Sequence, residues 1–184
     1  MATPSFQLLK PKTLDFSSSL LSLLHLILQK IREEERKVVF DQYFEKEKDI
    51  VTGIVQRVMG KNVSINLGKA DAVLSENEQV KGETFQPTER IKVYILEVKD
   101  TPKGPRILVS RTHPGLVKRL FESEVAEVKD GTVEIKSIAR EAGSRTKIAV
   151  WSNDPDVDAV GACVGMNGAR VNAVVEELRG EKID

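Results

Sequence analysis

Two glycines near the carboxyl end of the chain restrict how this region can fold. Gly165 and Gly168 have two residues between them and lie within the segment Gly161–Arg179. Apolar residues follow at positions i, i+3, i+4 and i+7, the spacing of one face of a helix: Val171, Val174, Val175 and Leu178. The pattern predicts a helix that begins directly after a glycine turn.

A second helix is predicted before the glycines. Asn153-Asp154-Pro155 offers a capping side chain followed by proline, which suits the first helical position. Glycine lets a backbone turn sharply and lets another backbone approach closely. The N–H groups at the start of the following helix would point into that gap and favour a phosphate. The alternative is a tight corner between two helices that binds nothing.

The surroundings of the glycine turn resemble a KH RNA-binding domain, in which a GxxG loop clamps a nucleic-acid backbone. A helix from Leu116 and strands at Thr132–Ala139 and Arg145–Trp151 precede the turn, in the order of a type II KH domain. The resemblance implies RNA contacts from the loop and its helix, at Gly165, Met166, Asn167, Gly168 and Arg170. Because Met166-Asn167 replaces the proline or basic residue usual in the family, we expect weak RNA binding.

Residues 50–110 have the pattern of a small β-barrel. Five short segments rich in β-branched residues alternate with turns marked by glycine or proline, as in a five-stranded OB fold. Val51–Val55, Asn62–Gly68 and Ile107–Arg111 resemble the RNA-binding domain first described in ribosomal protein S-one. Basic residues are the candidate RNA contacts: Arg57, Lys61, Lys69, Lys99, Lys103, Arg106 and Arg111. Phe85 and Tyr94 are the aromatic residues of this segment, so its stacking platform is poor.

The amino-terminal residues are the least informative. Ser17–Ser19 could cap a helix that begins with the leucine-rich run Leu20–Leu28, which is too short to span a bilayer. A signal peptide without a cleavage site, an organellar transit peptide and a segment foreign to the domains that follow remain alternatives. We favour a helix that hides its leucines against a neighbour. Gln29–Asp49 continues as a charged connector helix without chemistry of its own.

Charge and cysteine content limit the possible functions. The chain has 28 basic and 28 acidic residues, with net +3 over residues 50–112 and net −3 over residues 113–184. This balance argues against a nonspecific polycation and requires any nucleic-acid contact to be local. The single cysteine, Cys163, rules out an intrachain disulfide, fits a reducing compartment and is expected to be a buried, inert thiol.

No enzymatic motif is found. Asp154, Asp156 and Asp158 imitate the start of a calcium-binding EF-hand loop, but Ala159 and Gly165 stand where that loop needs glycine and glutamate. The glycine turn lacks the lysine and the serine or threonine of a P-loop. We therefore expect no catalytic residue, no metal site and no cofactor.

Motifs along the second half of the chain resemble one family. They are Ser110–Leu116, Asp130–Lys136, Ser152–Pro155, Val160–Gly165 and Gly180–Asp184. From about residue 28 to residue 184 the chain is similar to the NusA family of bacterial transcription elongation, termination and antitermination factors. The resemblance implies binding of single-stranded nascent RNA beside RNA polymerase, in the cytoplasm, by a monomer without membrane contact, cofactor or catalysis. The alternative is a protein-interaction or folding fragment with little RNA affinity of its own.

We therefore expect an α+β chain with four parts: an amino-terminal stretch, a connector helix, a five-stranded OB-fold barrel and a type II KH domain. Their predicted ranges are 1–28, 29–49, 50–112 and 113–184, and the breaker His113-Pro114-Gly115 marks the last boundary. The resemblance further implies that the chain holds the end of the family's first domain and stops where the last KH strand begins.

Overall fold

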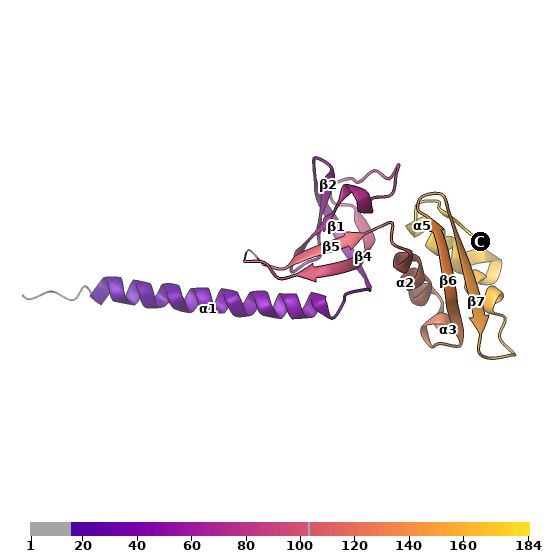
Figure 1. Ribbon diagram of the computed structural model, residues 1–184, viewed down its shortest axis with the longest axis horizontal. Helices are drawn as coiled ribbons and strands as arrows, with labels where there is room; N and C mark the ends of the chain where they lie inside the picture. Colours follow the sequence, from indigo (N-terminus) through magenta and orange to yellow (C-terminus); the bar gives the residue numbers. More distant parts are fainter. Residues whose placement is uncertain (1–15, 103) are drawn as a thin grey trace, which may run out of the picture. The chain divides into compact units, whose positions relative to one another are not determined.

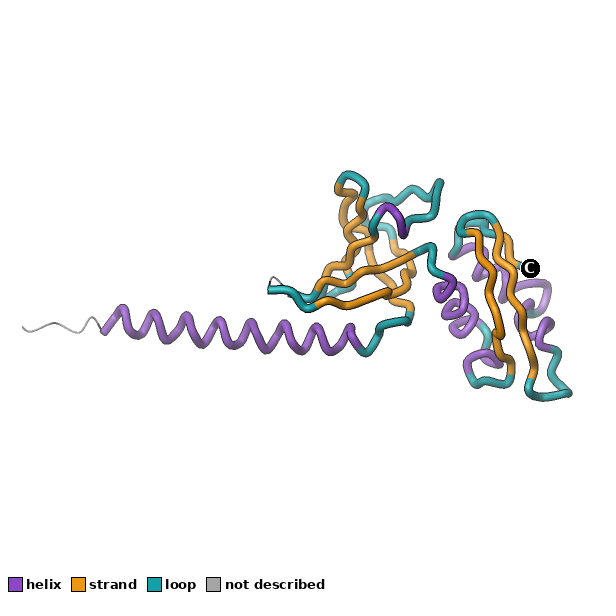
Figure 2. Tube along the Cα trace, viewed as in Figure 1, coloured by secondary structure: helices purple, strands orange, loops and turns teal. Residues whose placement is uncertain are grey.

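The computed structural model describes residues 16–102 and 104–184, whose helices and strands are shown in Figures 1 and 2. Residues up to Lys37 and residues Val38–Asp184 form separate compact units. The first unit consists of the start of the long helix α1, and the second holds its last turns together with all the strands. The predicted α+β class, with a helix, a barrel and a KH-type region in this order, is confirmed.

Helix α1 spans Phe16–Phe44 and is drawn in indigo in Figure 1. It begins before Ser17–Ser19, so the predicted serine cap is wrong. The leucines of Leu20–Leu28 are exposed along the helix, and no described residue hides them, contrary to our expectation. In the part of the chain that the structure describes, we find no helix with the length and apolarity that crossing a bilayer requires.

Five strands close into a barrel with the neighbour order β1-β2-β3-β5-β4. All pairs are antiparallel except β3 with β5, and β1 closes the barrel by pairing with both β2 and β4. Figure 2 shows these strands in orange. Their bounds are Ile50–Met59 for β1, Asn62–Asn66 for β2, Asp71–Leu74 for β3, Arg90–Lys99 for β4 and Arg106–Ser110 for β5. A short 3₁₀ helix, η1 (Glu76–Glu78), follows β3.

Alternating β-branched side chains fill the barrel because every second residue of a strand points inward. Val63, Ile65 and Ile107 are completely or almost completely buried there. Gly53 permits the close approach of β1 to β2, since a Cβ at this position would lie 2.3 Å from Cγ2 of Ile65. Tyr43 from the last turn of α1 is buried against the barrel and donates its hydroxyl hydrogen to the Leu67 carbonyl at 2.8 Å.

The KH region combines a three-stranded sheet, ordered β6-β7-β8, with helices on one face. Figure 1 shows β6 and β7 as a long hairpin. The elements are α2 (Pro114–Glu124), α3 (Ala126–Lys129), β6 (Val133–Glu141), β7 (Arg145–Ser152), α4 (Ala159–Val164), η2 (Met166–Gly168), α5 (Ala169–Glu177) and β8 (Lys182–Ile183). Strand β8 runs parallel to β7.

The core of the KH region explains the helical stripe seen in the sequence. Val174 of α5 and Leu178 directly after it are buried with Leu120 and Phe121 of α2, and Ile148 of β7 packs against this cluster. The opposite face of the hairpin is exposed and carries Ser137, Ala139, Ala149 and Trp151. The sheet is therefore covered by helices on one side only in the described chain.

The predicted start of the first helix of the glycine turn is wrong. Helix α4 begins at Ala159, and its cap is Asp158, whose carboxylate accepts a hydrogen bond from the Val160 N–H at 3.1 Å. The Asp154 carboxylate instead accepts from the Asp156 N–H at 2.9 Å, which makes a local turn. The Asn153 amide donates to the Gly131 carbonyl and is thereby held to the start of β6.

Candidate nucleic-acid interface

The glycine turn joins α4 to α5 through backbone conformations that few residues adopt. Gly165 has φ 73° and ψ 176°, and Gly168 has φ 78° and ψ 11°. Asn167 between them is also left-handed, with φ 53° and ψ 25°. The conformation of Gly165 is open essentially to glycine alone, while asparagine tolerates the left-handed region. The two glycines therefore build the turn, as the sequence predicts.

The two residues between the glycines form the exposed tip of the turn. Met166 is 87% exposed, and Asn167 is also exposed. Inside the turn, the Gly168 N–H donates to the Gly165 carbonyl at 3.2 Å, and the Ala169 N–H donates to the Met166 carbonyl. An anion at the tip would compete with these internal hydrogen bonds at two amides, so other groups must contribute to its binding.

Arg170 lies behind the turn and is held by two acceptors. Its Nη1 donates to the Ala162 carbonyl of α4 at 2.8 Å and to the Glu127 carboxylate of α3 at 2.8 Å. The backbone N–H of Glu127 and the Arg170 guanidinium both lower the pKa of this carboxyl. No local sequence signal points to Glu127, because 43 residues separate it from Arg170 and no spacing rule connects them.

Cys163 is buried beneath the turn, in α4, as predicted. Burial raises the pKa of its thiol, and the nearby Glu127 carboxylate raises it further. The thiol therefore stays protonated at neutral pH and is a poor nucleophile. Its place in the core cluster of the KH region gives it a packing role.

The barrel separates its predicted basic contacts into two groups, as the strand register shows. Arg57 and Lys61 lie at the β1–β2 turn, where Met59 pairs with Asn62. Lys99 and Arg106 lie opposite each other, at the end of β4 and the start of β5. The start of β3 pairs with the same end of β5 and follows the turn that contains Lys69, so Lys69 belongs to this second group. All five are exposed. Lys61, Lys69 and Lys99 contact Glu76, Gln42 and Glu97, respectively. Lys103 lies outside the described residues.

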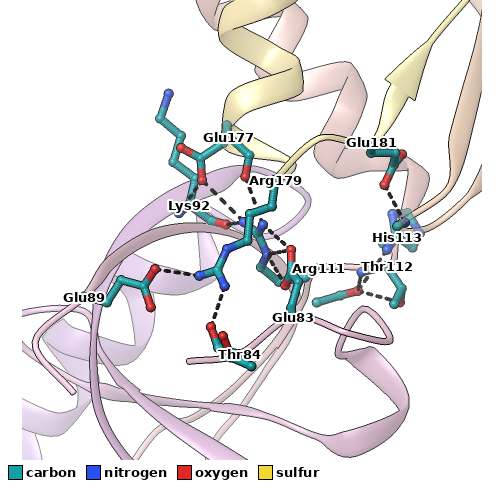
Figure 3. A network of polar contacts seen from close by, with 12 residues as sticks. Glu83, Thr84, Glu89, Lys92, Arg111, Thr112, His113, Glu177, Arg179 and Glu181 are labelled. Atoms are coloured by element: carbon teal, nitrogen blue, oxygen red, sulfur yellow. Dashed lines mark hydrogen bonds and ion pairs between the residues drawn. The ribbon is translucent and has the colours of Figure 1, made fainter. Parts of the chain in front are cut away.

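Arg111 does not face solvent, so its prediction as an RNA contact is wrong. Its side chain is 1% exposed and pairs with Glu83, with Nη2 at 2.6 Å from one carboxylate oxygen. It also donates to the Lys92 carbonyl at 2.9 Å and to the Glu177 carbonyl at 3.0 Å. Figure 3 shows the guanidinium between Glu83, in the loop that precedes β4, and Glu177 of α5. Arg111 joins the barrel to the helix that follows the glycine turn.

Arg179 makes a second connection beside Arg111. Its guanidinium donates to Glu89 at 2.7 Å and to the Thr84 carbonyl, and it lies 5.2 Å from the centroid of the Phe85 ring (Figure 3). Tyr94, the other aromatic residue of the barrel segment, is buried and stacks on His113 at 4.6 Å. Both aromatic rings therefore contact other side chains of the protein, which agrees with the expectation that the barrel offers few rings for stacking with bases.

Comparison with known proteins matches both parts of this arrangement. Residues 45–110 match the S1 RNA binding domain, and residues 111–184 match the NusA-like first KH domain. Over residues 45–184 the chain belongs to the NusA family. The transcription termination/antitermination protein NusA of Bacillus subtilis is 58% identical over 158 residues, which is 86% of this chain. The proteins of the same name from Halalkalibacterium halodurans and Thermus thermophilus are 53% and 45% identical, over 86% and 88% of this chain.

The chain spans less than half the length of these NusA relatives, covering 43%, 41% and 42% of them. The matched part is the barrel and the first KH region. The two NusA-family domains meet at Arg111, the first residue of the KH match, and this residue is buried between them.

The aspartates near α4 have structural roles in this NusA-family domain. Asp158 caps α4, and Asp154 closes the turn before it. Among the residues that the structure describes, no group of three or more His, Cys, Asp or Glu side chains is placed to hold a metal ion.

Proposed function

We propose that this chain binds single-stranded RNA at the Gly165–Gly168 turn and acts in transcription beside RNA polymerase. The observation that carries the proposal is the turn itself: two glycines with positive φ present an exposed two-residue tip between α4 and α5. KH domains clamp four nucleotides on such a loop. The relatives are named for transcription termination and antitermination, which supports a role in controlling elongation, pausing and release of the transcript.

The barrel contributes additional phosphate contacts in this proposal. Lys99 and Arg106 lie directly opposite each other on β4 and β5, where like charges destabilise a sheet, and the ion pair of Lys99 with Glu97 at 3.0 Å offsets only the charge of Lys99. A bound phosphate would relieve that repulsion. Lys69, Arg57 and Lys61 extend the basic surface at the two ends of the barrel. We propose that the protein works in the cytoplasm as a monomer, without a cofactor and without catalysing a reaction.

The test introduces two carboxylates at the tip without changing the glycines. In the variant Met166→Asp with Asn167→Asp, both side chains are exposed, and aspartate tolerates the left-handed conformation of residue 167. We expect roughly tenfold or more weaker binding of a labelled single-stranded RNA of mixed sequence, because like charges at the contact repel. Fluorescence anisotropy at low and physiological salt measures the affinity.

A matched control places the same charges elsewhere. Ser137→Asp with Ala139→Asp adds two carboxylates to the exposed face of β6, on the other side of the sheet from the helices. This variant should bind RNA almost as tightly as the wild type. Equal loss in both variants would mean that net charge, rather than the turn, decides binding. No binding by the wild type at low salt would refute the proposed function.

A further inference from the structure

Arg170 is the nearest cation to the turn in the sequence, yet its hydrogen bonds point into the protein. Its side chain is 35% exposed and that of Glu127 is 32% exposed. The guanidinium contacts α4 through the Ala162 carbonyl and α3 through the Glu127 carboxylate. One side chain therefore connects three helices: α5, which carries it, and the two helices that it contacts.

The aliphatic part of Arg170 lies directly against the first glycine. A Cβ added to Gly165 would be 2.8 Å from Cγ of Arg170 and 3.1 Å from Cδ. The stem thus occupies the space in which any other residue at position 165 would place its side chain. Contact with the stem and the positive φ of Gly165 both favour glycine here.

The Ala162 carbonyl needs a partner because it lies in the last turn of α4. The last four carbonyls of a helix have no N–H donor within the helix itself. Helix α4 ends at Val164, and the Gly165 N–H returns to the Gly161 carbonyl at 2.8 Å. Arg170 supplies a charged donor to the next carbonyl, so it fixes the end of α4 relative to the start of α5.

We propose that Arg170 and Glu127 are positioning residues that hold the turn in its binding shape, with Glu127 holding the guanidinium in place. The inference rests on the RNA-binding function proposed above and names residues that set the geometry of that site. It has an unusual consequence. Although RNA is an anion, removing the acidic side chain of Glu127 weakens RNA binding, because Arg170 then loses its anchor.

The opposite mechanism makes the opposite prediction. If Arg170 bound an RNA phosphate directly, Glu127 would compete with RNA for the guanidinium, and its removal would tighten binding. We expect Glu127→Ala and Arg170→Met each to weaken RNA binding by roughly three- to tenfold, the range for the loss of one hydrogen bond of ordinary net strength, since both side chains are about one-third exposed. Glu127→Gln, which keeps a hydrogen-bond acceptor, should fall between the wild type and Glu127→Ala.

The salt dependence of RNA affinity distinguishes a residue that positions the turn from one that contacts an RNA phosphate. Each phosphate contact to a single strand contributes about 0.7 to the slope of log affinity against log salt concentration. For a positioning residue, Arg170→Met leaves the slope of the wild type unchanged while the affinity falls. A slope reduced by about 0.7, together with tighter binding by Glu127→Ala, would overturn the proposal.

A measurement without RNA tests the same inference independently. Hydrogen exchange of the Gly165 and Gly168 amides should be faster in Glu127→Ala and in Arg170→Met than in the wild type, while exchange of the buried Val174 amide stays the same. If the wild type fails to bind RNA but the turn amides respond in this way, the proposed function fails and the positioning role stands. Unchanged exchange at both glycines in both variants would refute the positioning role whether or not RNA binds.

Discussion

At the scale of the residue, the buried ion pair of Arg111 is expected to contribute strongly to the stability of the fold. Its guanidinium is 1% exposed, and its partner Glu83 is 5% exposed. Arg111→Met would leave the Glu83 carboxylate buried without its cation, and breaking such a pair typically costs about 3–5 kcal/mol. We expect a loss of this size in the free energy of unfolding, measured by urea denaturation with the barrel and the KH region followed by separate probes. Arg111→Lys should rescue little, because an ammonium cannot reproduce the guanidinium fork.

Arg119 provides the comparison for Arg111. It also pairs with carboxylates, Glu122 and Asp49, but its side chain is 39% exposed. Exposed ion pairs contribute about 0–1 kcal/mol, so Arg119→Met should change stability much less. A loss for Arg111→Met as small as that for Arg119→Met would show that the buried pair adds no more stability than an exposed one.

Residue environments of this kind were the least predictable feature of the sequence. Arg111 has the same local signal as Arg57 or Arg106: a basic residue at the end of a β-rich segment. Its partners lie 28 and 66 residues away, so burial depends on how the barrel and the KH region meet. For the same reason, the sequence identified Arg170 but not Glu127, its partner from α3.

At the scale of the element, Glu181 fastens the short strand β8 to the β6–β7 hairpin. It accepts two hydrogen bonds from Arg140 at 2.9 Å, one from the Gly143 N–H at 2.8 Å and one from the Thr146 hydroxyl. Burial alone would raise the pKa of Glu181, but these donors outweigh it and hold the pKa below its ordinary value of 4.5. The carboxylate therefore stabilises the fold above pH 4.5, and that contribution is lost as the pH falls through the lowered pKa.

Glu181→Gln isolates this contribution. The variant should lose about 3 kcal/mol or more at pH 7, because the buried Arg140 then lacks a charged partner. The difference in unfolding free energy between wild type and variant should shrink as the pH is lowered from 7 to 3. Comparing the two proteins at each pH cancels the effect of the other carboxyls with lowered pKa values, among them Asp130 and Glu134. A difference that stays constant over this range would contradict the assignment.

Elements with a strong periodic pattern were predictable, and those decided by one polar contact were not. The apolar stripe of α5 and the alternating β-branched residues of the barrel both result from burial of one face of the element, and this periodicity is visible in the sequence. The start of α4 was misplaced because Asn153-Asp154-Pro155 has the composition of a cap. Asn153 instead bonds the start of β6, and Asp158 serves as the cap. Several asparagine and aspartate residues suited to capping lie between positions 153 and 158, and the local pattern does not show which of them caps the helix.

At the scale of the whole molecule, residues Val38–Asp184 should unfold as one cooperative unit. The barrel residue Tyr94 is buried in the core cluster of the KH region, and Arg111 and Arg179 tie the end of α5 to the barrel segment Glu83–Glu89. Trp151, the single tryptophan, reports on the KH sheet through its fluorescence. The amide NMR signals of Val63 and Leu74 report on the barrel. We expect both probes to give the same urea midpoint.

Removing the connection should separate the two transitions. In Arg111→Met, the barrel and the KH region lose their buried ion pair but keep their own cores, so the probe of the less stable part should change at lower urea than the other. The wild type and Arg119→Met should keep coincident curves, since neither loses a buried contact between the two parts. Separate midpoints already in the wild type would mean that the junction is too weak to couple them. The glycine turn would then be positioned by α3, α4 and α5 alone, and the barrel would supply RNA contacts without fixing their distance from the turn.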